Sequence, residues 1–347
     1  MAKIKVGILG ATGTVGQRFI QLLENHPWFQ ITEVAASENS AGKTYEEAVK
    51  GRWMQHTPIP SRIRNLKVKE CKPNLNCSVI FSGLDAAVAG EIEAAFADKG
   101  YKVFSNAKNH RMDAHVPLMI PEVNGDHAKL IKTQKRKGFI VTNPNCTTIG
   151  MVMALAPLHK EYGVKSVIMT SMQAISGAGY PGVASMDIVD NVIPYIGGEE
   201  EKVQIETLKL LGTIEAGKVK PANIAVSAHC NRVAVIDGHT ETISFSLHKN
   251  PTIDEIKRTL SNYNPLGKLK LPSAPVQPII VMDEQNRPQP KLDRNLEKGM
   301  ACVVGRIRKD DVLGYKMVVL SHNTIRGAAG CSILNAELMK AKGFLEE

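Results

Sequence analysis

Cys146 is the residue in this sequence whose type and position best suit a nucleophile. It follows a short apolar run and an Asn-Pro-Asn turn, and it opens an almost wholly apolar helical pattern. A thiol at a helix start lies at the positive end of the backbone dipole, which lowers its pKa and offers N–H donors to an oxyanion. These properties predict a cysteine that forms acyl-thioester intermediates.

The remaining cysteines lack this setting. The six cysteines are scattered along the chain and form no CxxC pair, so neither a disulfide framework nor a metal site is expected. Cys77, Cys302 and Cys331 stand among apolar residues, and we expect them to be buried structural thiols.

Arg232 and His239 are candidate partners of the Cys146 thiol. Two strand-like runs flank Asp237 and Gly238, and a two-residue hairpin there would place both candidate side chains on one face. The histidine would then serve as an acid/base and the arginine as a bidentate clamp for a carboxylate. Two other interpretations stay open: a turn histidine bonded to the backbone, and an arginine in a structural ion pair.

Gly10, Gly13 and Gly16 form a G-x-x-G-x-x-G pattern between an apolar run and a helical pattern. At a strand-to-helix turn, missing side chains let backbone N–H groups and the helix N-terminus approach a pyrophosphate. The pattern predicts a dinucleotide site, and the alternative is a glycine-rich turn that binds nothing.

The end of the second predicted strand indicates which dinucleotide binds. An acidic residue ending that strand would bind a ribose 2′-hydroxyl and favour NAD. Here the strand ends before Ser37, Glu38, Ser40 and Lys43. The two serines would donate hydrogen bonds to a 2′-phosphate and the lysine would add positive charge, whereas Glu38 opposes it. NADP is therefore the predicted cofactor, with NAD as a weaker alternative.

Lys108 and Arg111 follow another predicted strand at its carboxyl end, where ligands of doubly wound folds bind. Both side chains would suit a phosphate group. A solvated basic loop is the alternative.

The elements that must position these residues change in character at Cys146. Before it, predicted strands at 4–9, 31–36, 78–82, 102–105 and 138–142 alternate with helical patterns at 15–25 and 86–99. After it come long strand candidates at 164–174, 225–236, 240–247 and 300–309 with few helices between them, and a proline-rich segment at 271–290 that is predicted to be an ordered loop. The fold class predicted is α/β: a Rossmann-type doubly wound parallel sheet, followed by an α+β domain with a mixed or antiparallel sheet.

Composition narrows the class of protein further. The chain has 347 residues, of which 43% are hydrophobic and 22% charged, as in ordinary globular proteins. The net charge of +9 fits anionic small molecules better than nucleic acid, because the basic residues are dispersed. Nucleic acid is therefore not expected as a partner. No secretory signal and no apolar stretch of about 18 residues is present, so a membrane is not expected as a partner either, and a cytoplasmic location is expected.

Taken together in order, the motifs resemble the aspartate-semialdehyde dehydrogenase family, particularly its archaeal and fungal branch. The resemblance covers nearly the whole chain. The motifs are GATGTVG at 10–16, SAGK at 40–43, SNAKNHR at 105–111, NPNCTT at 143–148, QAISGAGYPG at 173–182, EEEK at 199–202, RVAVIDGH at 232–239 and NTIRGAAG at 323–330.

The resemblance implies a role for each matching residue. Cys146 would be the acyl-thioester nucleophile, His239 the acid/base, and Gln173 would position the substrate near the thiol. The implied substrate-binding residues are Arg232 for the α-carboxylate, Glu200 for the amino group, and Arg111 with Lys202 for the phosphate. The implied cofactor-binding residues are Gly10, Thr12, Gly13, Thr14, Val15, Gly16, Ser37, Ser40, Lys43, Ser82 and Gly83, with Ser176, Gly177 and Asn323 on the nicotinamide side.

The implied reaction is the NADPH-dependent reductive dephosphorylation of L-4-aspartyl phosphate to L-aspartate 4-semialdehyde, in the biosynthesis of lysine, threonine, methionine and isoleucine. Asn39 stands where many relatives have a basic residue, so selectivity for NADP over NAD is expected to be relaxed. Residues 1–145 and 323–347 would form the dinucleotide-binding domain, and 146–322 the catalytic and oligomerisation domain of a homodimer or homotetramer.

Three rival functions remain. Malonyl-CoA reductase resembles the same branch and uses the same thioester chemistry on a CoA ester, and N-acetylglutamyl-phosphate reductase is more distant. A dinucleotide-binding regulatory protein that has lost catalysis is the alternative from another class. The Cys146, Gln173, Arg232 and His239 set argues against the regulatory protein.

Overall fold

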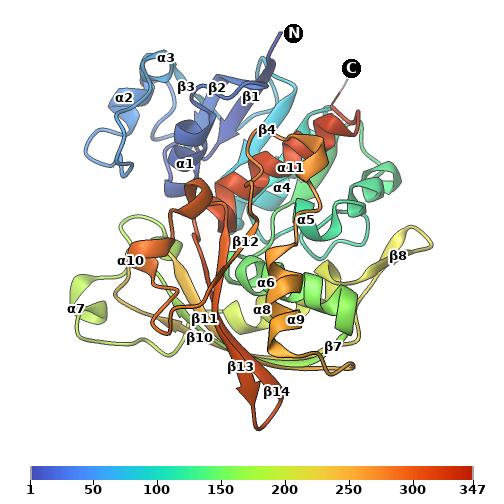
Figure 1. Cartoon of the computed structure of the whole chain (residues 1–347). Helices are drawn as coiled ribbons and strands as arrows, with labels where there is room; N and C mark the ends of the chain where they lie inside the picture. Colours follow the sequence, from blue (N-terminus) through green and yellow to red (C-terminus); the bar gives the residue numbers. More distant parts are fainter. Residues whose placement is uncertain (1, 346–347) are drawn as a thin grey trace. The chain divides into compact units, whose positions relative to one another are not determined.

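The computed structural model describes residues 2–345, which form two compact units (Figure 1). The first unit contains the chain up to Met119, Asp126–Asn143 and the segment from Ala328 onward, and the second contains Ile120–Gly125 and Pro144–Gly327. Relative to the predicted division, 120–125, 144–145 and 323–327 lie in the second unit. No helix among residues 2–345 is both long and apolar enough to cross a membrane.

The first unit is a doubly wound parallel sheet, as predicted. Its six strands lie in the order β3-β2-β1-β4-β5-β6, and all the pairings are parallel. This order reverses at β1, which is the topological switch of a Rossmann-type sheet. The strands are β1 (Ile4–Leu9), β2 (Phe29–Ala36), β3 (Val68–Glu70), β4 (Val79–Ser82), β5 (Lys102–Ser105) and β6 (Phe139–Thr142).

Helices of the first unit follow the strands in the expected alternation. The longer ones are α1 (Thr14–Leu23), α4 (Ala86–Asp98) and α11 (Gly330–Ala341), and the short ones are α2 (Tyr45–Ala48), α3 (Ser61–Arg64) and the 3-10 segment η1 (His127–Thr133). The edge strand β3 was not predicted, because a three-residue run with two charged side chains gives no periodic signal.

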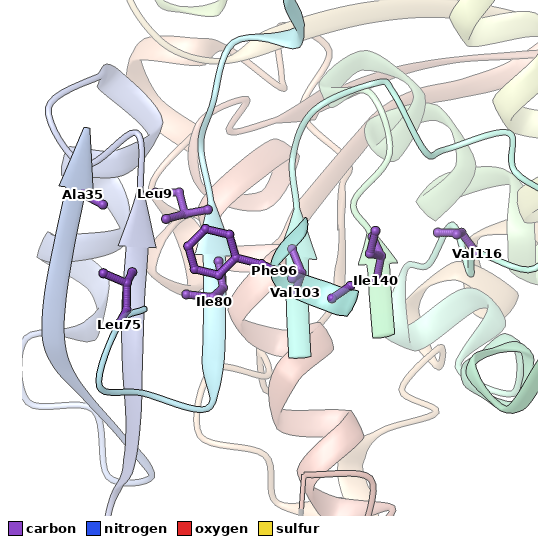
Figure 2. Close-up of a cluster of buried hydrophobic side chains, with 9 residues drawn as sticks. Leu9, Ala35, Leu75, Ile80, Phe96, Val103, Val116 and Ile140 are labelled. Atoms are coloured by element: carbon purple, nitrogen blue, oxygen red, sulfur yellow. The ribbon is translucent and has the colours of Figure 1, made fainter. Parts of the chain in front are cut away.

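A cluster of buried apolar side chains packs α4 against these strands. Phe96 of α4 is fully buried and lies over Leu9, Ile80 and Val103 from three neighbouring strands (Figure 2). Parallel strands covered on both faces read as continuous apolar runs, which is why the sequence identified them. Their carboxyl ends therefore emerge at one edge of the sheet.

The second unit contains a mixed six-stranded sheet, also as predicted. Its order is β10-β7-β11-β14-β13-β12, in which β10 with β7 and β12 with β13 are parallel pairs and the others are antiparallel. The strands are β7 (Val164–Gln173), β10 (Ala225–Arg232), β11 (His239–Leu247), β12 (Ile279–Met282), β13 (Cys302–Asp310) and β14 (Gly314–Ser321), and β8 (Thr213–Glu215) with β9 (Lys218–Lys220) form a separate ribbon. The prediction of a loop throughout 271–290 was wrong where β12 pairs with β13.

The predicted hairpin around Asp237 and Gly238 was wrong. Strand β7 lies between β10 and β11, so these two strands do not pair with each other. The connecting segment crosses the end of β7 and bonds to its continuation: Ile175 donates its N–H to the Val235 carbonyl and Ser176 donates to the Ile236 carbonyl. These bonds replace the ladder that a two-residue hairpin would have formed.

One face of this sheet is covered by helices. α6 (Cys146–Tyr162), α8 (Glu199–Leu210) and α9 (Ile253–Ser261) contact the sheet strands, and Figure 1 shows them together on one side of it. Every residue of 147–158 in α6 is buried, which explains its apolar sequence. The short helices of the unit are α5 (Pro121–Asn124), α7 (Ser185–Ile188), α10 (Pro290–Asp293) and the 3-10 segments η2 (Ile175–Ala178), η3 (Gly267–Leu269) and η4 (Leu296–Gly299). The π-helical turn η5 (Ile325–Ala329) begins in this unit and continues past its last residue, Gly327.

Candidate active site

Cys146 is the first residue of α6, and the residue before it caps the helix. The side-chain oxygen of Asn145 accepts hydrogen bonds from the backbone N–H groups of Thr147 and Thr148, both at 3.0 Å. Asparagine is among the best N-cap residues because it satisfies these first-turn donors. The predicted helix start is therefore confirmed, but the Thr147 and Thr148 amides are engaged by the cap rather than available to an oxyanion.

Two carboxylates of α8 hold Asn145 in place. Its side-chain amide donates to Glu199 Oε1 at 2.7 Å, and its backbone N–H donates to Glu206 Oε2 at 2.7 Å. Glu199 also bonds Lys202 Nζ at 2.8 Å. Burial alone would raise the pKa of Glu199, but the charge and hydrogen bond of Lys202, with the hydrogen bond of Asn145, outweigh it and lower the pKa.

The thiol meets His239 as the sequence predicted. Cys146 Sγ lies 3.2 Å from His239 Nε2, and His239 Nδ1 accepts a hydrogen bond from the Ala174 backbone N–H at 3.0 Å. Because an amide N–H can only donate, Nδ1 carries no proton, and the neutral ring carries its proton on Nε2. The histidine therefore presents an N–H group to the sulfur.

His239 is held neutral by its surroundings. The ring is fully buried, and this burial is the main cause that lowers the pKa of His239 to about 3. The positive charges of Arg232 and His322 lower the pKa further, while Glu199 acts in the opposite direction. An imidazolium would also turn the Ala174 amide contact into a repulsion, so the ring functions as a neutral hydrogen-bond donor.

Arg232 shares a wall with His239, although no hairpin brings them together. Arg232 ends β10 in register with Gln173, which ends β7, and its Nη1 donates to the Ala174 carbonyl at 2.7 Å. A Cβ added to Gly177 would lie 3.0 Å from Arg232 Nη1 and 3.4 Å from His239 Cε1. Within residues 2–345 no carboxylate lies at ion-pair distance from this guanidinium, which disfavours the structural ion pair.

Asn323 connects the two loops beside this wall. Its side-chain oxygen accepts from the Gly238 N–H at 2.9 Å, and its amide donates to Ser176 Oγ at 2.8 Å. Gln173 is buried and its amide donates to Ser171 Oγ at 3.2 Å. The structure thus brings Cys146, Gln173, Ser176, Gly177, Arg232, His239 and Asn323 together in the second unit.

The EEEK motif contributes Glu199, a residue that the sequence prediction missed because it named Glu200. Glu200 accepts from the Cys230 backbone N–H at 3.0 Å, at the edge of β10. Glu199 instead is buried, and its charge acts on both His239 and Arg232. The spacing was the available signal, because residues three apart lie on one helical face and Glu199 is three before Lys202.

Gly327 was also missed as a site residue. It lies in the π-helical turn η5, and a Cβ added there would be 2.7 Å from Cys146 Cβ and 3.1 Å from its Cα. No real Cβ approaches so closely without displacing its neighbour. A bare backbone at this position therefore lets the nucleophile keep its place.

The glycine loop of the first unit has the geometry of a phosphate cradle. Gly10 has a φ of 68°, and a Cβ there would lie 2.6 Å from the Gly83 carbonyl oxygen. A Cβ at Gly16 would lie 2.2 Å from the Gly10 carbonyl oxygen. Gly13 is the N-cap of α1, whose first turn contains no capping side chain and no acidic residue, so the positive helix end suits a pyrophosphate.

The other predicted cofactor and phosphate residues of this unit lie at the carboxyl edge of its sheet or in the loops that follow. Thr12, Thr14, Val15 and Gly83 are half-buried, Ser37 and Lys43 are exposed, and Ser40 and Ser82 are buried. Arg111 is buried and its Nη2 donates to the Asn106 carbonyl at 2.7 Å, whereas Lys108 is exposed. Their ligand-binding roles stay predictions.

The remaining cysteines differ from Cys146. Burial raises the pKa of Cys230 to about 11 and raises that of the fully buried Cys302 further. Cys331 is buried as well. Cys77 was predicted to be buried but is only half-buried, and its partial burial raises its pKa to about 12. Among residues 2–345 no cluster of three histidine, cysteine or carboxylate side chains is arranged to hold a metal ion.

Comparison with known proteins defines the class. Residues 5–131 match the model of the semialdehyde dehydrogenase NAD binding domain, and residues 155–326 match the model of the semialdehyde dehydrogenase dimerisation domain. A nucleotide-binding sheet and a catalytic thiol beside a histidine are what such a dehydrogenase requires.

The chain belongs to the aspartate-semialdehyde dehydrogenase family. It is 49% identical to the aspartate-semialdehyde dehydrogenase of Methanothermobacter thermautotrophicus, covering 97% of this chain and 99% of the relative. It is 50% identical to that of Schizosaccharomyces pombe, covering 99% and 100%. The crystal structure of aspartate semialdehyde dehydrogenase with NADP from Candida albicans superposes with a TM-score of 0.92 at 47% identity, covering 99% of this chain and 100% of that one.

The buried neutral His239 makes stability fall in mild acid. The unfolded state takes up a proton below a pKa of about 6.5, whereas the folded state resists protonation until about pH 3. Stability from this group is therefore present above about pH 6.5 and lost as pH falls, amounting to about 2 kcal/mol between pH 7 and pH 5. Urea unfolding at pH 7 and at pH 5 should show this loss of stability for the wild type. The stability of His239→Gln, which lacks the titrating ring, should fall by about 2 kcal/mol less between the two pH values. Equal losses in both proteins would contradict it.

Gly327→Ala is expected to displace the thiol. The new methyl group must push the Cys146 backbone, which changes the 3.2 Å separation of Sγ from His239. Steady-state assays should show kcat reduced by about tenfold or more with the fold retained. Gly197→Ala is the control, because the nearest atom to its added Cβ is 3.9 Å away. A wild-type kcat in Gly327→Ala would contradict this prediction, because it would mean that the π-helical turn moves and the thiol stays in place.

Proposed function

We propose that the chain catalyses the NADP-dependent reductive dephosphorylation of L-4-aspartyl phosphate to L-aspartate 4-semialdehyde through an acyl-thioester on Cys146. The observation that carries this proposal is the thiol at the start of α6, 3.2 Å from a buried neutral histidine. Family membership supplies the substrate, since relatives of nearly full length carry the name aspartate-semialdehyde dehydrogenase.

The first half of the reaction forms the thioester. The Cys146 thiolate attacks the acyl carbon of the substrate, a C–S bond forms, the C–O bond to the phosphoryl group breaks, and phosphate leaves. The positive charge of Arg232 interacts with the Cys146 sulfur and favours its thiolate form. The His239 Nε2–H donates to the sulfur in the resting state and is available to the substrate oxygen once the sulfur is acylated.

The second half reduces the thioester. NADPH supplies the hydride. His239 stabilises the oxygen of the resulting thiohemiacetal by donating from Nε2, and collapse of that species releases the aldehyde and returns the thiolate. A neutral donor suits this step because it stabilises an oxyanion without adding an imidazolium to a buried site.

Substrate recognition is assigned to charged side chains. Arg232 would clamp the α-carboxylate as a bidentate donor. Glu199, buried and bonded to Lys202, is a better placed partner for the α-ammonium than Glu200, which bonds a strand edge. Lys202 and Arg111 remain the predicted phosphate-binding residues.

The first unit supports NADP as the cofactor. The Gly10–Gly16–Gly83 packing leaves no room for side chains around the start of α1, which fits a pyrophosphate. Ser37 and Lys43, exposed just after β2, would contact a 2′-phosphate. The Candida albicans relative was crystallised with NADP.

We also propose that the chain forms a homodimer through the open face of the second sheet, and that it functions in the cytoplasm. Ile168, Thr170 and Met172 of β7 and Thr242 and Ser244 of β11 lie at the centre of that face and are exposed or half-exposed, opposite the side that α6 covers. None of them carries a charge, and the matched family model is a dimerisation domain. A second copy of the same face is therefore the partner that fits.

Cys146→Ala is expected to abolish turnover while leaving dinucleotide binding intact, because the thiol lies in the second unit and the glycine loop in the first. The assay is phosphate-dependent reduction of NADP by aspartate semialdehyde, and NADP binding is measured by calorimetry. Cys77→Ala, at a thiol outside the site, should keep full activity. Full activity in Cys146→Ala would refute the mechanism.

These assays and a parallel assay with malonyl-CoA separate the rival functions. Malonyl-CoA-dependent oxidation of NADPH without aspartate-semialdehyde activity would identify a malonyl-CoA reductase. Dinucleotide binding with neither activity would identify a non-catalytic regulatory protein.

Thr170→Arg is expected to weaken the dimer, since a charge would be buried at the centre of the paired faces. Light scattering after size exclusion should show a monomer at concentrations where the wild type is dimeric. Val312→Arg, in the exposed turn between β13 and β14, is the control and should remain dimeric. An unchanged dimer in Thr170→Arg would place the interface elsewhere.

A further inference from the structure

Glu241 is a buried carboxyl group that the proposed mechanism does not use. It lies on β11 two residues after His239 and therefore on the same face of the strand. The side chain is fully buried, and neither of its oxygens has a hydrogen-bond partner among residues 2–345. A buried polar group without a partner is destabilising, so the presence of Glu241 in the core needs a structural or functional explanation.

A second unpartnered group lies beside it. Ser321 of β14 stands opposite His239 in the sheet register, is buried, and its hydroxyl also lacks a partner among the described residues. A Cβ added to Gly150 would lie 2.8 Å from Glu241 Oε1 and 2.9 Å from Ser321 Oγ. Both groups therefore converge on the bare backbone of α6, one helical turn after Cys146.

Burial, without a nearby positive charge from the described residues to oppose it, favours the neutral form of Glu241. Burial raises the pKa of Glu241 well above its usual value. The ionisable groups that it influences are the thiols of Cys230 on β10 and Cys302 on β13. On β7 and β14 it is paired with Ser171 and Val319, which are uncharged. Arg326 acts on Cys302 but is bound to Glu122.

A neutral carboxylic acid has one O–H donor and can accept as well, and a serine hydroxyl does the same. Internal waters in proteins occupy such polar buried positions and make about three hydrogen bonds. The Gly150 carbonyl also accepts a weak bond from the Cys302 thiol at 3.5 Å, which places that thiol beside the same turn of α6.

We propose that Glu241, as a neutral acid, and Ser321 form a buried polar bridge over Gly150, completed by one internal water molecule, that positions Cys146 against His239. The bridge ties β11, which carries His239, to β14 and to α6, which carries Cys146. Glu241 is thus a positioning residue that never contacts the substrate. The inference rests on the proposed roles of Cys146 and His239.

Three substitutions test this positioning role. Glu241→Gln keeps a neutral polar group of the same shape, and its kcat should stay within about twofold of the wild type. Glu241→Leu removes the bridge, and its kcat should fall by about tenfold with KM for aspartate semialdehyde nearly unchanged. Ser321→Ala removes only one arm and should show a smaller fall, which keeps the test available if Glu241→Leu does not fold.

A readout without turnover tests positioning directly. The rate of Cys146 alkylation by iodoacetamide, followed by mass spectrometry of that peptide, should drop in Glu241→Leu and Ser321→Ala and stay unchanged in Glu241→Gln. Ile243→Val removes a methylene from the next buried position of the same strand face and is the control for loss of packing alone. It should leave the alkylation rate at its wild-type value.

Crystallography completes the test. A crystal structure of the full chain at high resolution should show a water within about 3.2 Å of both Glu241 and Ser321. A Glu241→Gln variant as slow as Glu241→Leu would overturn the proposal, because it would require an ionised carboxylate. Wild-type alkylation in Glu241→Leu would overturn it as well. Alkylation reports the thiol whether or not the proposed substrate is correct, so a failure here is distinct from retained turnover in Cys146→Ala.

Discussion

The catalytic geometry depends on the two backbone groups of one residue, Ala174, directly after β7. Its N–H donates to His239 Nδ1, and its carbonyl accepts from Arg232. The first bond fixes the ring proton on the nitrogen that faces the sulfur, and the second anchors the cation beside it. Since β7 lies between β10 and β11, side chains from two strands that never pair are brought to the same backbone groups.

The thiol is held by an equally specific set of contacts from the other side. Asn145 caps α6 and is bound through its side chain and its backbone to the two carboxylates Glu199 and Glu206 of α8. Lys202 offsets the charge of Glu199, and the cation Arg232 stands beside a neutral histidine. That balance suits a reaction whose nucleophile and intermediates are anionic, because each negative species meets a fixed donor or charge.

The sequence predicted the elements better than their partners. The parallel strands of the first unit were found because strands buried on both faces are continuous apolar runs, and β3 and β12 were missed because short edge strands give little signal. The hairpin prediction failed although Asp237 and Gly238 form a common hairpin sequence. Turn propensity is local, whereas the insertion of β7 between β10 and β11 is decided by pairing across about 60 to 80 residues.

The sequence by itself determined the local features: a cysteine at a helix start, a glycine turn after a strand, and a change from parallel to mixed sheet at residue 146. Each depends on residues close together in the chain, where capping, periodicity and glycine conformation act. Only the tertiary structure decided which carboxylate of the EEEK motif lies in the site, that Gly327 must lack a side chain, and that Glu241 and Ser321 meet over Gly150. These facts follow from strand order and register, and the sequence carries no local signal for which distant residues those will place in contact.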